Sequence, residues 1–124
     1  MRVLLVDDEK EFVSTLAERL TLRGIDAQWT TAGHEALRLA EPGCFDIAVL
    51  DVKMPEMGGV KLKERLQEKC PDMKFLFLTG YGSEKDFRDV SCQVGEGFCL
   101  VKPVDIDDLI AKMMEASERG GGKV

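Results

Sequence analysis

Five short apolar segments recur along the chain, and each ends at a polar residue or at residues that favour turns. The third segment, IAVL at residues 47–50, is apolar at every position and stops at an aspartate. A continuous apolar run of this length is typical of a strand that is buried on both faces of a parallel sheet. The pattern therefore predicts five strands, over residues 2–6, 25–30, 47–50, 74–78 and 98–101.

The segments between these strands carry apolar residues at helical spacing. In the first of them, Phe12, Leu16 and Leu20 share one helical face, and Gly24 follows as a helix stop. The same criteria predict helices over residues 9–23, 31–40 (capped by Thr31) and 59–70, a fourth beginning at Ser83 and a fifth beginning at Asp105. This alternation predicts an α/β fold, a doubly wound five-stranded parallel sheet of the flavodoxin-like (βα)5 type with strand order 2-1-3-4-5.

Length and charge narrow the class of protein. A chain of 124 residues suits one domain, which we place at residues 1–118, followed by a glycine-rich flexible tail or linker start at residues 119–124. The net charge of −6 argues against direct nucleic acid binding, which needs a basic surface. No apolar stretch approaches the length of a membrane span, and the first strand begins without a signal peptide before it. We therefore expect a cytoplasmic domain that does not bind membranes.

The cysteines and the single histidine are expected to have packing or surface roles. Cys44, Cys70, Cys92 and Cys99 show no CxxC spacing, so in a cytoplasmic chain we expect them to be reduced and mostly packed in the core. His34 lies at a charged helix start, away from the strand ends, and is expected on the surface.

Polar side chains that can carry chemistry stand at the carboxyl ends of four predicted strands. Asp7 and Asp8 follow the first strand, and the third, fourth and fifth strands are followed by Asp51, Thr79 and Lys102. Taken singly, each has a simpler role open to it, such as a helix capping box that begins at Asp8 or a turn at Asp51. The carboxyl ends of parallel strands lie along one edge of the sheet, however, so together these side chains are expected to share one site.

Three carboxylates in one site favour a particular chemistry. Clustered carboxylates repel one another, so at neutral pH they need a cation or a bound proton. All-oxygen ligation suits a hard ion such as Mg²⁺. A carboxylate beside Mg²⁺ and a lysine can attack a phosphorus atom and form an acyl phosphate, while both cations offset charge on the phosphoryl oxygens. The predicted site therefore suits phosphoryl transfer to an aspartate.

Four motifs surround these strand ends: LLVDD at residues 4–8, LDVKMPEMGG at 50–59, FLTG at 77–80 and LVKP at 100–103. In this order and at this spacing they resemble the receiver domain of two-component response regulators, over essentially the whole chain. The resemblance implies that Asp51 accepts a phosphoryl group from the phosphohistidine of a histidine kinase or phosphotransfer protein. It also implies a signalling module rather than a turnover enzyme, although the family catalyses its own phosphorylation and dephosphorylation.

The resemblance further implies how the phosphoryl group and the metal are held. Asp8, Asp51 and the backbone carbonyl of Lys53 are expected to bind Mg²⁺, or Mn²⁺ in its place. Asp7 is expected to act on the metal through a water molecule, and Lys102 to hold a phosphoryl oxygen.

The signalling step is also implied by the resemblance. Thr79 is expected to move towards the phosphate and to reset the surface of the fourth helix, fifth strand and fifth helix, where a partner binds. The peptide bond before Pro103 is expected to be cis. This chain has Cys99 where the family usually has an aromatic switch residue, and Lys53 and Tyr81 stand at loop positions that tune the phosphate lifetime in the family.

The output stays open on the sequence, and three other functions are alternatives to the receiver domain. The output is either a separate protein or an effector domain outside this sequence, and a homodimer through the fourth helix, fifth strand and fifth helix is a further option. The missing switch aromatic favours a receiver-like interaction module that is not phosphorylated, but the complete acidic set, Thr79 and Lys102 count against it. A Mg²⁺-dependent aspartyl phosphatase usually needs a second acid where this chain has Lys53, and a nucleotide-binding flavodoxin-like protein would need a glycine-rich loop after the first strand.

Overall fold

Parallel strands form the centre of the molecule in the computed structural model, which describes residues 1–41, 43–54, 56–80 and 99–121, with side chains described to residue 117. The strands are β1 (Arg2–Val6), β2 (Asp26–Thr30), β3 (Ile47–Asp51), β4 (Lys74–Thr79) and β5 (Cys99–Val101). They form one sheet in the order β2-β1-β3-β4-β5, with every neighbouring pair parallel. The predicted flavodoxin-like sheet is confirmed.

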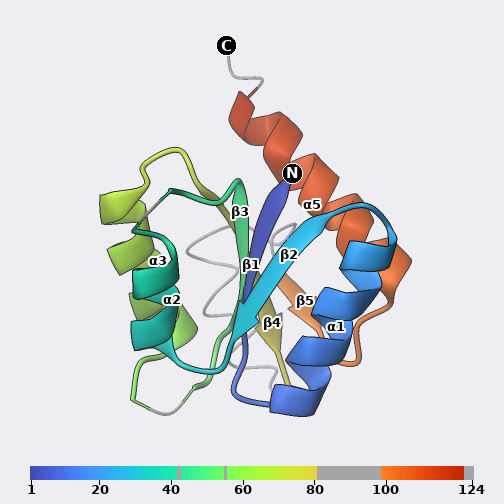
Figure 1. The fold of residues 1–124 in the computed structure, drawn as a ribbon, viewed down its shortest axis with the longest axis horizontal. Coiled ribbons are helices and arrows are strands. Elements are labelled where there is room, and N and C mark those ends of the chain that lie inside the picture. The colour runs from blue at the N-terminus through green and yellow to red at the C-terminus, as the bar shows by residue number, and fades with distance from the viewer. Residues whose placement is uncertain (42, 55, 81–98, 122–124) are drawn as a thin grey trace.

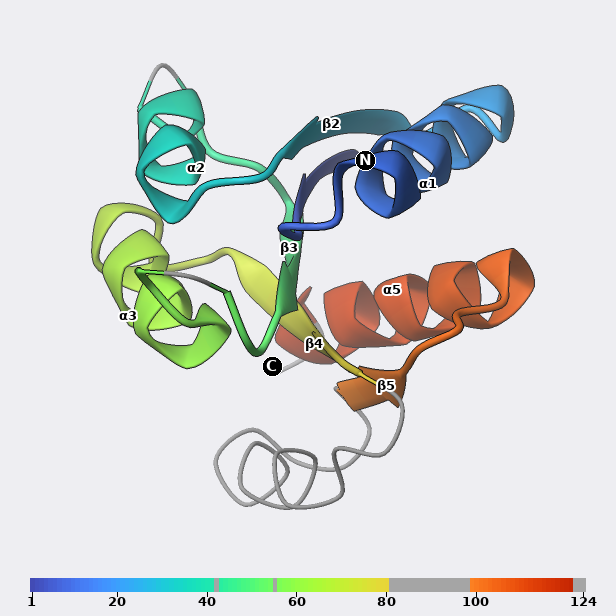
Figure 2. The same ribbon diagram turned by 90° about the horizontal axis from the view of Figure 1, so that it is seen from below.

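Helices cover both faces of this sheet (Figure 1). Seen along the sheet, α1 (Lys10–Leu22) and α5 (Ile106–Gly121) lie on one face, and α2 (Gly33–Leu39) and α3 (Gly59–Lys69) lie on the other (Figure 2). The helix predicted to begin at Ser83 lies outside the described residues, as does Tyr81. Among the helices that the structure describes, none combines the length and the hydropathy that a membrane span requires.

Alternate side chains of β1 divide the core into two layers, because successive residues of a strand project to opposite faces of the sheet. Leu4 and Val6 pack with Leu62 of α3 in one layer, while Val3 and Leu5 belong to the layer beneath α1 and α5. Each fully buried leucine of this kind stabilises the fold by roughly 1.5–3 kcal/mol relative to an exposed one. Burial on both faces explains why the central strands are apolar at nearly every position.

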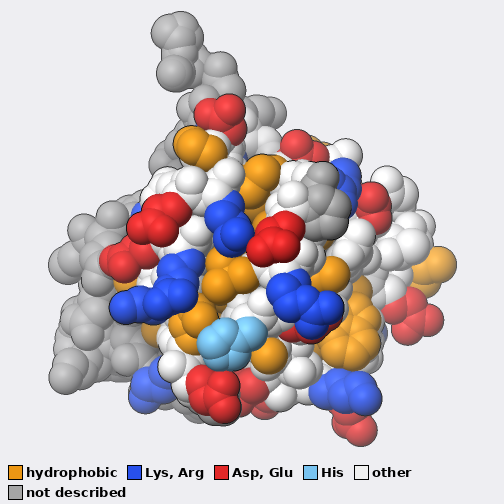
Figure 3. Space-filling view, turned by 60° about the vertical axis from the view of Figure 1, so that its left-hand side comes forward, with side chains coloured by type: hydrophobic (Ala, Val, Ile, Leu, Met, Phe, Trp, Pro, Cys, Tyr) orange, Lys and Arg blue, Asp and Glu red, His pale blue; other side chains and the backbone are white. Residues whose placement is uncertain are grey.

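The charged run at residues 61–69 belongs to the exposed side of α3. Leu62 and Leu66 are fully buried beneath the helix, whereas the charged residues around them are largely exposed. On the face formed by α2 and α3, acidic and basic side chains intermingle (Figure 3). One ion pair there joins Lys69 Nζ to Glu41 Oε2 at 3.4 Å. This mixture of signs is typical of a solvated helix face.

Two helix caps suggested by the sequence, at Asp8 and at Thr31, are not observed. The N-cap of α1 is Glu9 rather than Asp8, and no side chain caps that helix. The reason is local: Asp7 Oδ1 accepts a hydrogen bond from the backbone N–H of Glu9 at 2.9 Å, which places Asp8 in the turn before the helix. The N-cap of α2 is likewise Ala32 rather than Thr31. The alternative of a capping box at Asp8 is therefore excluded, and the Asp8 side chain is available for another role.

The end of the chain continues as helix further than the domain boundary at residue 118. Asp105 Oδ2 accepts a hydrogen bond from the backbone N–H of Asp108 at 3.1 Å, in agreement with a helix that begins at Asp105. From there α5 runs to Gly121 and includes two of the terminal glycines. Residues 122–124 lie outside the described part of the chain.

The expectation of four reduced cysteines is wrong for two of them. Cys44 and Cys70 form a disulfide, with their Cα atoms 5.9 Å apart. Cys44 lies in the segment before β3, and Cys70 is the C-cap of α3. Because α3 runs back along the sheet, its last residue returns to the edge where β3 begins. Cys99 has no disulfide partner and is buried, and Cys92 lies outside the described residues.

Candidate functional site

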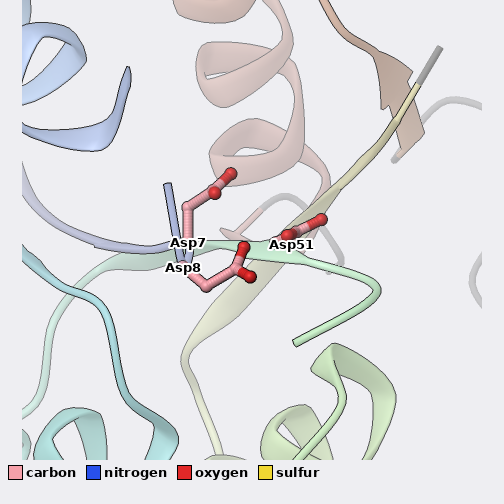
Figure 4. Close-up of side chains that lie close together, drawn as sticks. All are labelled: Asp7, Asp8 and Asp51. Carbon is pink, nitrogen blue, oxygen red and sulfur yellow. The ribbon is translucent and has the colours of Figure 1, made fainter. Parts of the chain in front are cut away.

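Three carboxylates meet at the carboxyl ends of two neighbouring strands. Asp7 and Asp8 follow β1, and Asp51 is the last residue of β3, which pairs with β1. Each of the three offers an oxygen within 4.8 Å of the others (Figure 4). Asp7 and Asp51 are buried, whereas Asp8 is exposed. The strand order thus brings together acids that are more than forty residues apart in the sequence.

Burial and mutual repulsion make this cluster hard to ionise in the absence of a cation. Burial raises the pKa of the Asp51 carboxyl, the negative charge of Asp7 raises it further, and the net result is a value of about 7, although Lys102 opposes the rise. Burial also raises the pKa of Asp7. Because the carboxyl groups of this site retain protons near neutral pH, a cation that replaces those protons binds there strongly.

Lys102 supplies part of that positive charge. Its Nζ lies 2.7 Å from Asp7 Oδ2 and 2.7 Å from Glu9 Oε1, but 3.8 Å from Asp51 Oδ2. Burial alone would lower the pKa of Lys102, yet its close contacts with the Asp7 and Glu9 carboxylates outweigh burial and raise that pKa. The ammonium also lies 4.8 Å from the ring centroid of Phe12. Lys102 is therefore charged and held beside Asp51 without being fully engaged by it.

Sequence reasoning missed Glu9 and Phe12 as members of this site. The helical pattern places Phe12 on the buried face of its helix and Glu9 within the helix itself. The available signal was the position of both residues at the start of α1, directly after the acidic pair. The contact between Glu9 and Lys102 spans 93 residues, so it becomes visible only when β5 is placed in the sheet.

Thr79 ends β4, the strand that pairs with β3, at the same edge of the sheet as the carboxylates. Its side chain is almost completely buried, and its Oγ1 has no hydrogen-bond partner among the described residues. A buried hydroxyl without a partner is costly, by roughly 1–3 kcal/mol. The backbone N–H of Lys102 donates to the carbonyl of Thr79 at 2.8 Å, so the two residues are fixed relative to each other. The Thr79 hydroxyl can therefore bind a group that enters this site.

The loop after β3 is held tightly against the strand end. The backbone N–H of Gly59 donates to the carbonyl of Val52 at 2.9 Å. A Cβ on Gly59 would lie only 2.3 Å from the carbonyl oxygen of Asp51, so no other residue fits without a shift of the backbone. Glu56, in the same loop, has a φ of 71°. Lys53 lies two residues after Asp51 in this loop, so its carbonyl belongs to the same edge of the sheet.

Cys99 and Pro103 flank Lys102 in sequence. Cys99 is buried, in the same core layer as Phe77, and burial raises the pKa of its thiol to about 11. The thiol is thus protonated at neutral pH. The peptide bond between Lys102 and Pro103 is cis. His34 is exposed, and its Nε2 lies 3.7 Å from Glu56 Oε1.

The arrangement can hold a hard cation and a phosphoryl group together. The donors are all oxygen atoms, from one exposed and two buried carboxylates, which fits Mg²⁺ or a similar ion. A lysine and an unpartnered hydroxyl stand at the same edge of the sheet. The sequence-predicted residues Asp7, Asp8, Asp51 and Lys102 are brought together, and Tyr81 is outside the described residues.

A family model and several curated proteins match this sequence. The sequence model of the family described as "Response regulator receiver domain" matches residues 3–114. The chain is 36% identical over 119 residues to "Sensor kinase CckA" of Brucella abortus (strain 2308), a match that covers 94% of this chain and 12% of that protein. Across that protein and two regulators from other bacteria, the chain spans between 12% and 63% of the length of its curated relatives.

Two solved structures show the same fold. One is a response regulator receiver domain protein (CheY-like) from Methanospirillum hungatei JF-1, with a TM-score of 0.84 and 28% identity over 99% of this chain and 98% of that one. The other is a response regulator protein from Burkholderia pseudomallei, solved with a phosphorylated aspartic acid, a calcium ion and citrate. Its TM-score is 0.79, with 30% identity over 94% of this chain and 69% of that one.

Proposed function

Because this chain belongs to the response regulator receiver domain family, we propose that it accepts a phosphoryl group on Asp51 and thereby changes its binding to a partner. The observation that carries the proposal is the position of Asp51. Its carboxylate is buried beside two further acids and a lysine, and the adjacent strand ends at Thr79, whose hydroxyl has no partner among the described residues. A structural turn aspartate would need none of these neighbours. The regulator from Burkholderia pseudomallei, which was solved with a phosphorylated aspartic acid, supports the same chemistry.

The proposed metal ligands are Asp8, Asp51 and the backbone carbonyl of Lys53, with Asp7 acting through a water molecule. The fit rests on the all-oxygen donor set and on the raised pKa of Asp51, because a carboxylate cluster with such a pKa lacks positive charge. Mg²⁺ is the proposed ion, with Mn²⁺ as a substitute. When bound, the ion offsets charge on the carboxylates and on the phosphoryl oxygens.

In the proposed transfer, a carboxylate oxygen of Asp51 attacks the phosphorus of a phosphohistidine. The new O–P bond forms an acyl phosphate, while the N–P bond breaks and its electron pair returns to the imidazole of the donor. Lys102 then holds a phosphoryl oxygen, for which its ammonium moves away from Glu9 and towards Asp51. Catalysis here consists of positioning and charge, because the carboxylates are already together before the donor arrives and Lys102 has only a short distance to move.

The proposed switch begins at Thr79. Its buried hydroxyl gains a hydrogen-bond acceptor when a phosphoryl oxygen enters the site, so the phosphorylated state fixes its side chain. β5 follows, because the backbone of Lys102 is hydrogen-bonded to Thr79. Cys99, in place of the usual aromatic residue, is too small to repeat a ring movement. We therefore propose that Thr79 and Lys102 carry the change to the surface of β5, α5 and the helix predicted to begin at Ser83. Lys53 and Tyr81 are the proposed determinants of the phosphate lifetime.

The proposed setting is two-component signalling in the cytoplasm. The donor is a histidine kinase or phosphotransfer protein, and the output is a separate protein or an effector domain. We propose residues 1–118 as the receiver domain and residues 119–124 as its tail or the start of a linker. A homodimer through β5, α5 and the helix predicted to begin at Ser83 is one form that partner binding can take; direct binding to nucleic acid or membrane is not proposed.

The experiment that tests this function measures intact mass after incubation with Mg²⁺ and acetyl phosphate, a small phosphoryl donor. We expect one phosphoryl group to be added to the wild-type chain, and none when Mg²⁺ is chelated or when Asp51→Asn replaces the acceptor. Asp72→Asn, an exposed acid at the opposite edge of the sheet, is the matched control and should be phosphorylated normally. A wild-type chain that gains no mass, or an Asp51→Asn variant that does, would show that the domain is an unphosphorylated interaction module or uses another acceptor.

A further inference from the structure

The Cys44–Cys70 disulfide lies at the edge of the sheet opposite the carboxylate site. Cys44 precedes the first residue of β3, whereas Asp51 is the last residue of that strand. The two sulfur-bearing residues differ in exposure, because Cys44 is exposed and Cys70 is 2% exposed. Cys44 is therefore the exposed member of the pair, from whose side an incoming thiol would approach.

Cys99 differs from the disulfide pair and has a purely structural role. It is buried in the core, has no disulfide partner, and burial raises the pKa of its thiol to about 11. Thiolates rather than thiols react with disulfides, so Cys99 is inert towards exchange. Among the three cysteines that the structure describes, the capacity for thiol–disulfide exchange belongs to Cys44 and Cys70.

A surface cavity of about 560 Å³ lies directly beside the disulfide. Its lining includes both cysteines, the acids Asp46 and Asp72, and the cation Lys74. A cavity of this volume accommodates a small organic ligand. Side chains of both charges suit a tripeptide thiol such as glutathione, which itself carries carboxylates and an ammonium group. The pair therefore has one exposed member and space for an exchange partner next to it.

We propose that Cys44 and Cys70 form a reversible thiol–disulfide modification site whose exchange partner is a low-molecular-weight thiol of the glutathione class. In the reducing direction, the thiolate of glutathione attacks the sulfur of Cys44, the Cys44–Cys70 bond breaks, and Cys70 leaves as a thiolate that takes up a proton. A second glutathione attacks the mixed disulfide and releases Cys44 as a thiol. The protein disulfide and two thiols thus become two protein thiols and one glutathione disulfide, and oxidation reverses these steps.

The disulfide links the start of β3 to the end of α3, so the chain that it closes contains Asp51 and the loop after it. Closing a segment of this length restricts the unfolded chain and so stabilises the fold. The carboxylate site lies at the other end of β3 and contains neither cysteine. Oxidation state is therefore expected to set the stability of the domain, independently of whether Asp51 accepts a phosphoryl group.

The test equilibrates the full chain in buffers with different ratios of reduced to oxidised glutathione and then blocks free thiols with N-ethylmaleimide in urea, so that buried Cys99 also reacts. Intact mass is then measured. In oxidising buffers we expect two of the four cysteines to escape alkylation, and a proteolytic digest to contain Cys44 and Cys70 in one linked fragment. In reducing buffers all four should be alkylated. Reduction should also lower the Tm of the wild type by roughly 5–15 °C.

Three variants assign the redox response to this cysteine pair. Cys44→Ser replaces the exposed partner, so its Tm should match that of the reduced wild type and should not respond to reductant. Cys92→Ser keeps both members of the pair and should behave as the wild type does. Asp51→Asn should form the disulfide normally, which keeps this result separate from phosphorylation. Alkylation of all four cysteines in oxidising buffer, a link to Cys92 or Cys99, or a wild-type Tm that ignores reductant would overturn the proposal.

Discussion

Lys102 is the residue on which the charge balance of the site depends. Its ammonium is shared among three carboxylates, with short contacts to Asp7 and Glu9 and a longer one to Asp51. Asp7 is buried and fixed, whereas the side chain of Glu9 is 62% exposed. An ammonium that is to bind a phosphoryl group on Asp51 can therefore give up its contact with Glu9 most easily. Glu9 thus competes with the phosphoryl group for Lys102.

This competition predicts the effect of Glu9→Gln. The substitution removes the charge that holds Lys102 away from Asp51, so phosphorylation by acetyl phosphate should become faster. An exposed ion pair contributes roughly 0.2–1 kcal/mol, which corresponds to a rate increase of roughly 1.5- to 5-fold. The measurement is the rate of mass increase at a fixed donor concentration.

Glu11→Gln is the control for that experiment, because it removes the same charge from an exposed position in the first turn of α1. It should change the rate much less than Glu9→Gln does. Equal rates in the two variants would show that only net charge matters and that Glu9 does not restrain Lys102.

At the scale of elements, the parts that could be predicted from the sequence are those that depend on local pattern. The apolar run before Asp51 identifies β3, because a strand that is buried on both faces of a sheet carries apolar side chains at nearly every position. The meeting of Asp7, Asp8 and Asp51 then follows from parallel pairing, since strand ends share one edge. Local pattern does not encode contacts made after distant elements pack. The Cys44–Cys70 bond needs α3 to return along β3, and the Lys102–Glu9 contact needs β5 in place, so neither could be predicted.

The junction between β3 and α3 gives a prediction at this scale. A Cβ on Gly59 would lie 2.3 Å from the carbonyl oxygen of Asp51, so Gly59→Ala must push the start of α3 away from the strand. We expect a loss of roughly 1–3 kcal/mol in the free energy of unfolding, although alanine normally favours a helix over glycine. Urea denaturation measures this loss.

Gly43→Ala is the matched control for the junction. Its Cβ would lie no closer than 3.7 Å to a neighbouring atom, the Nη1 of Arg2, so the substitution should leave the free energy of unfolding nearly unchanged. If Gly59→Ala is as stable as Gly43→Ala, the close approach of α3 to Asp51 is not a constraint on the fold.

At the scale of the whole molecule, the two edges of the sheet affect stability in opposite directions. The carboxyl edge gathers buried negative charge, which destabilises the fold until a cation or a proton arrives. The other edge carries the disulfide, which stabilises the fold by restricting the unfolded chain. β3 connects the two edges, because it begins beside Cys44 and ends at Asp51. The domain therefore combines an acidic site that lowers its stability with a disulfide at the opposite edge of the sheet that raises it.

The raised pKa of Asp51 at the carboxyl edge predicts how the stability of the fold depends on pH. In the folded state the pKa of Asp51 is about 7, above the value of 3.8 for an unperturbed aspartate, so between these values the folded chain holds a proton that the unfolded chain has lost. Without metal, the free energy of unfolding should therefore fall as pH rises through this window. Asp51→Asn should flatten the profile and be more stable than the wild type above the window, by roughly 1–4 kcal/mol. Urea denaturation across the window measures both curves.

Mg²⁺ should stabilise the wild type above pH 7 by binding the folded state, and should have less effect on Asp51→Asn. Asp72→Asn should retain the wild-type slope, and parallel curves for the wild type and Asp51→Asn would contradict the assignment of the strain to Asp51.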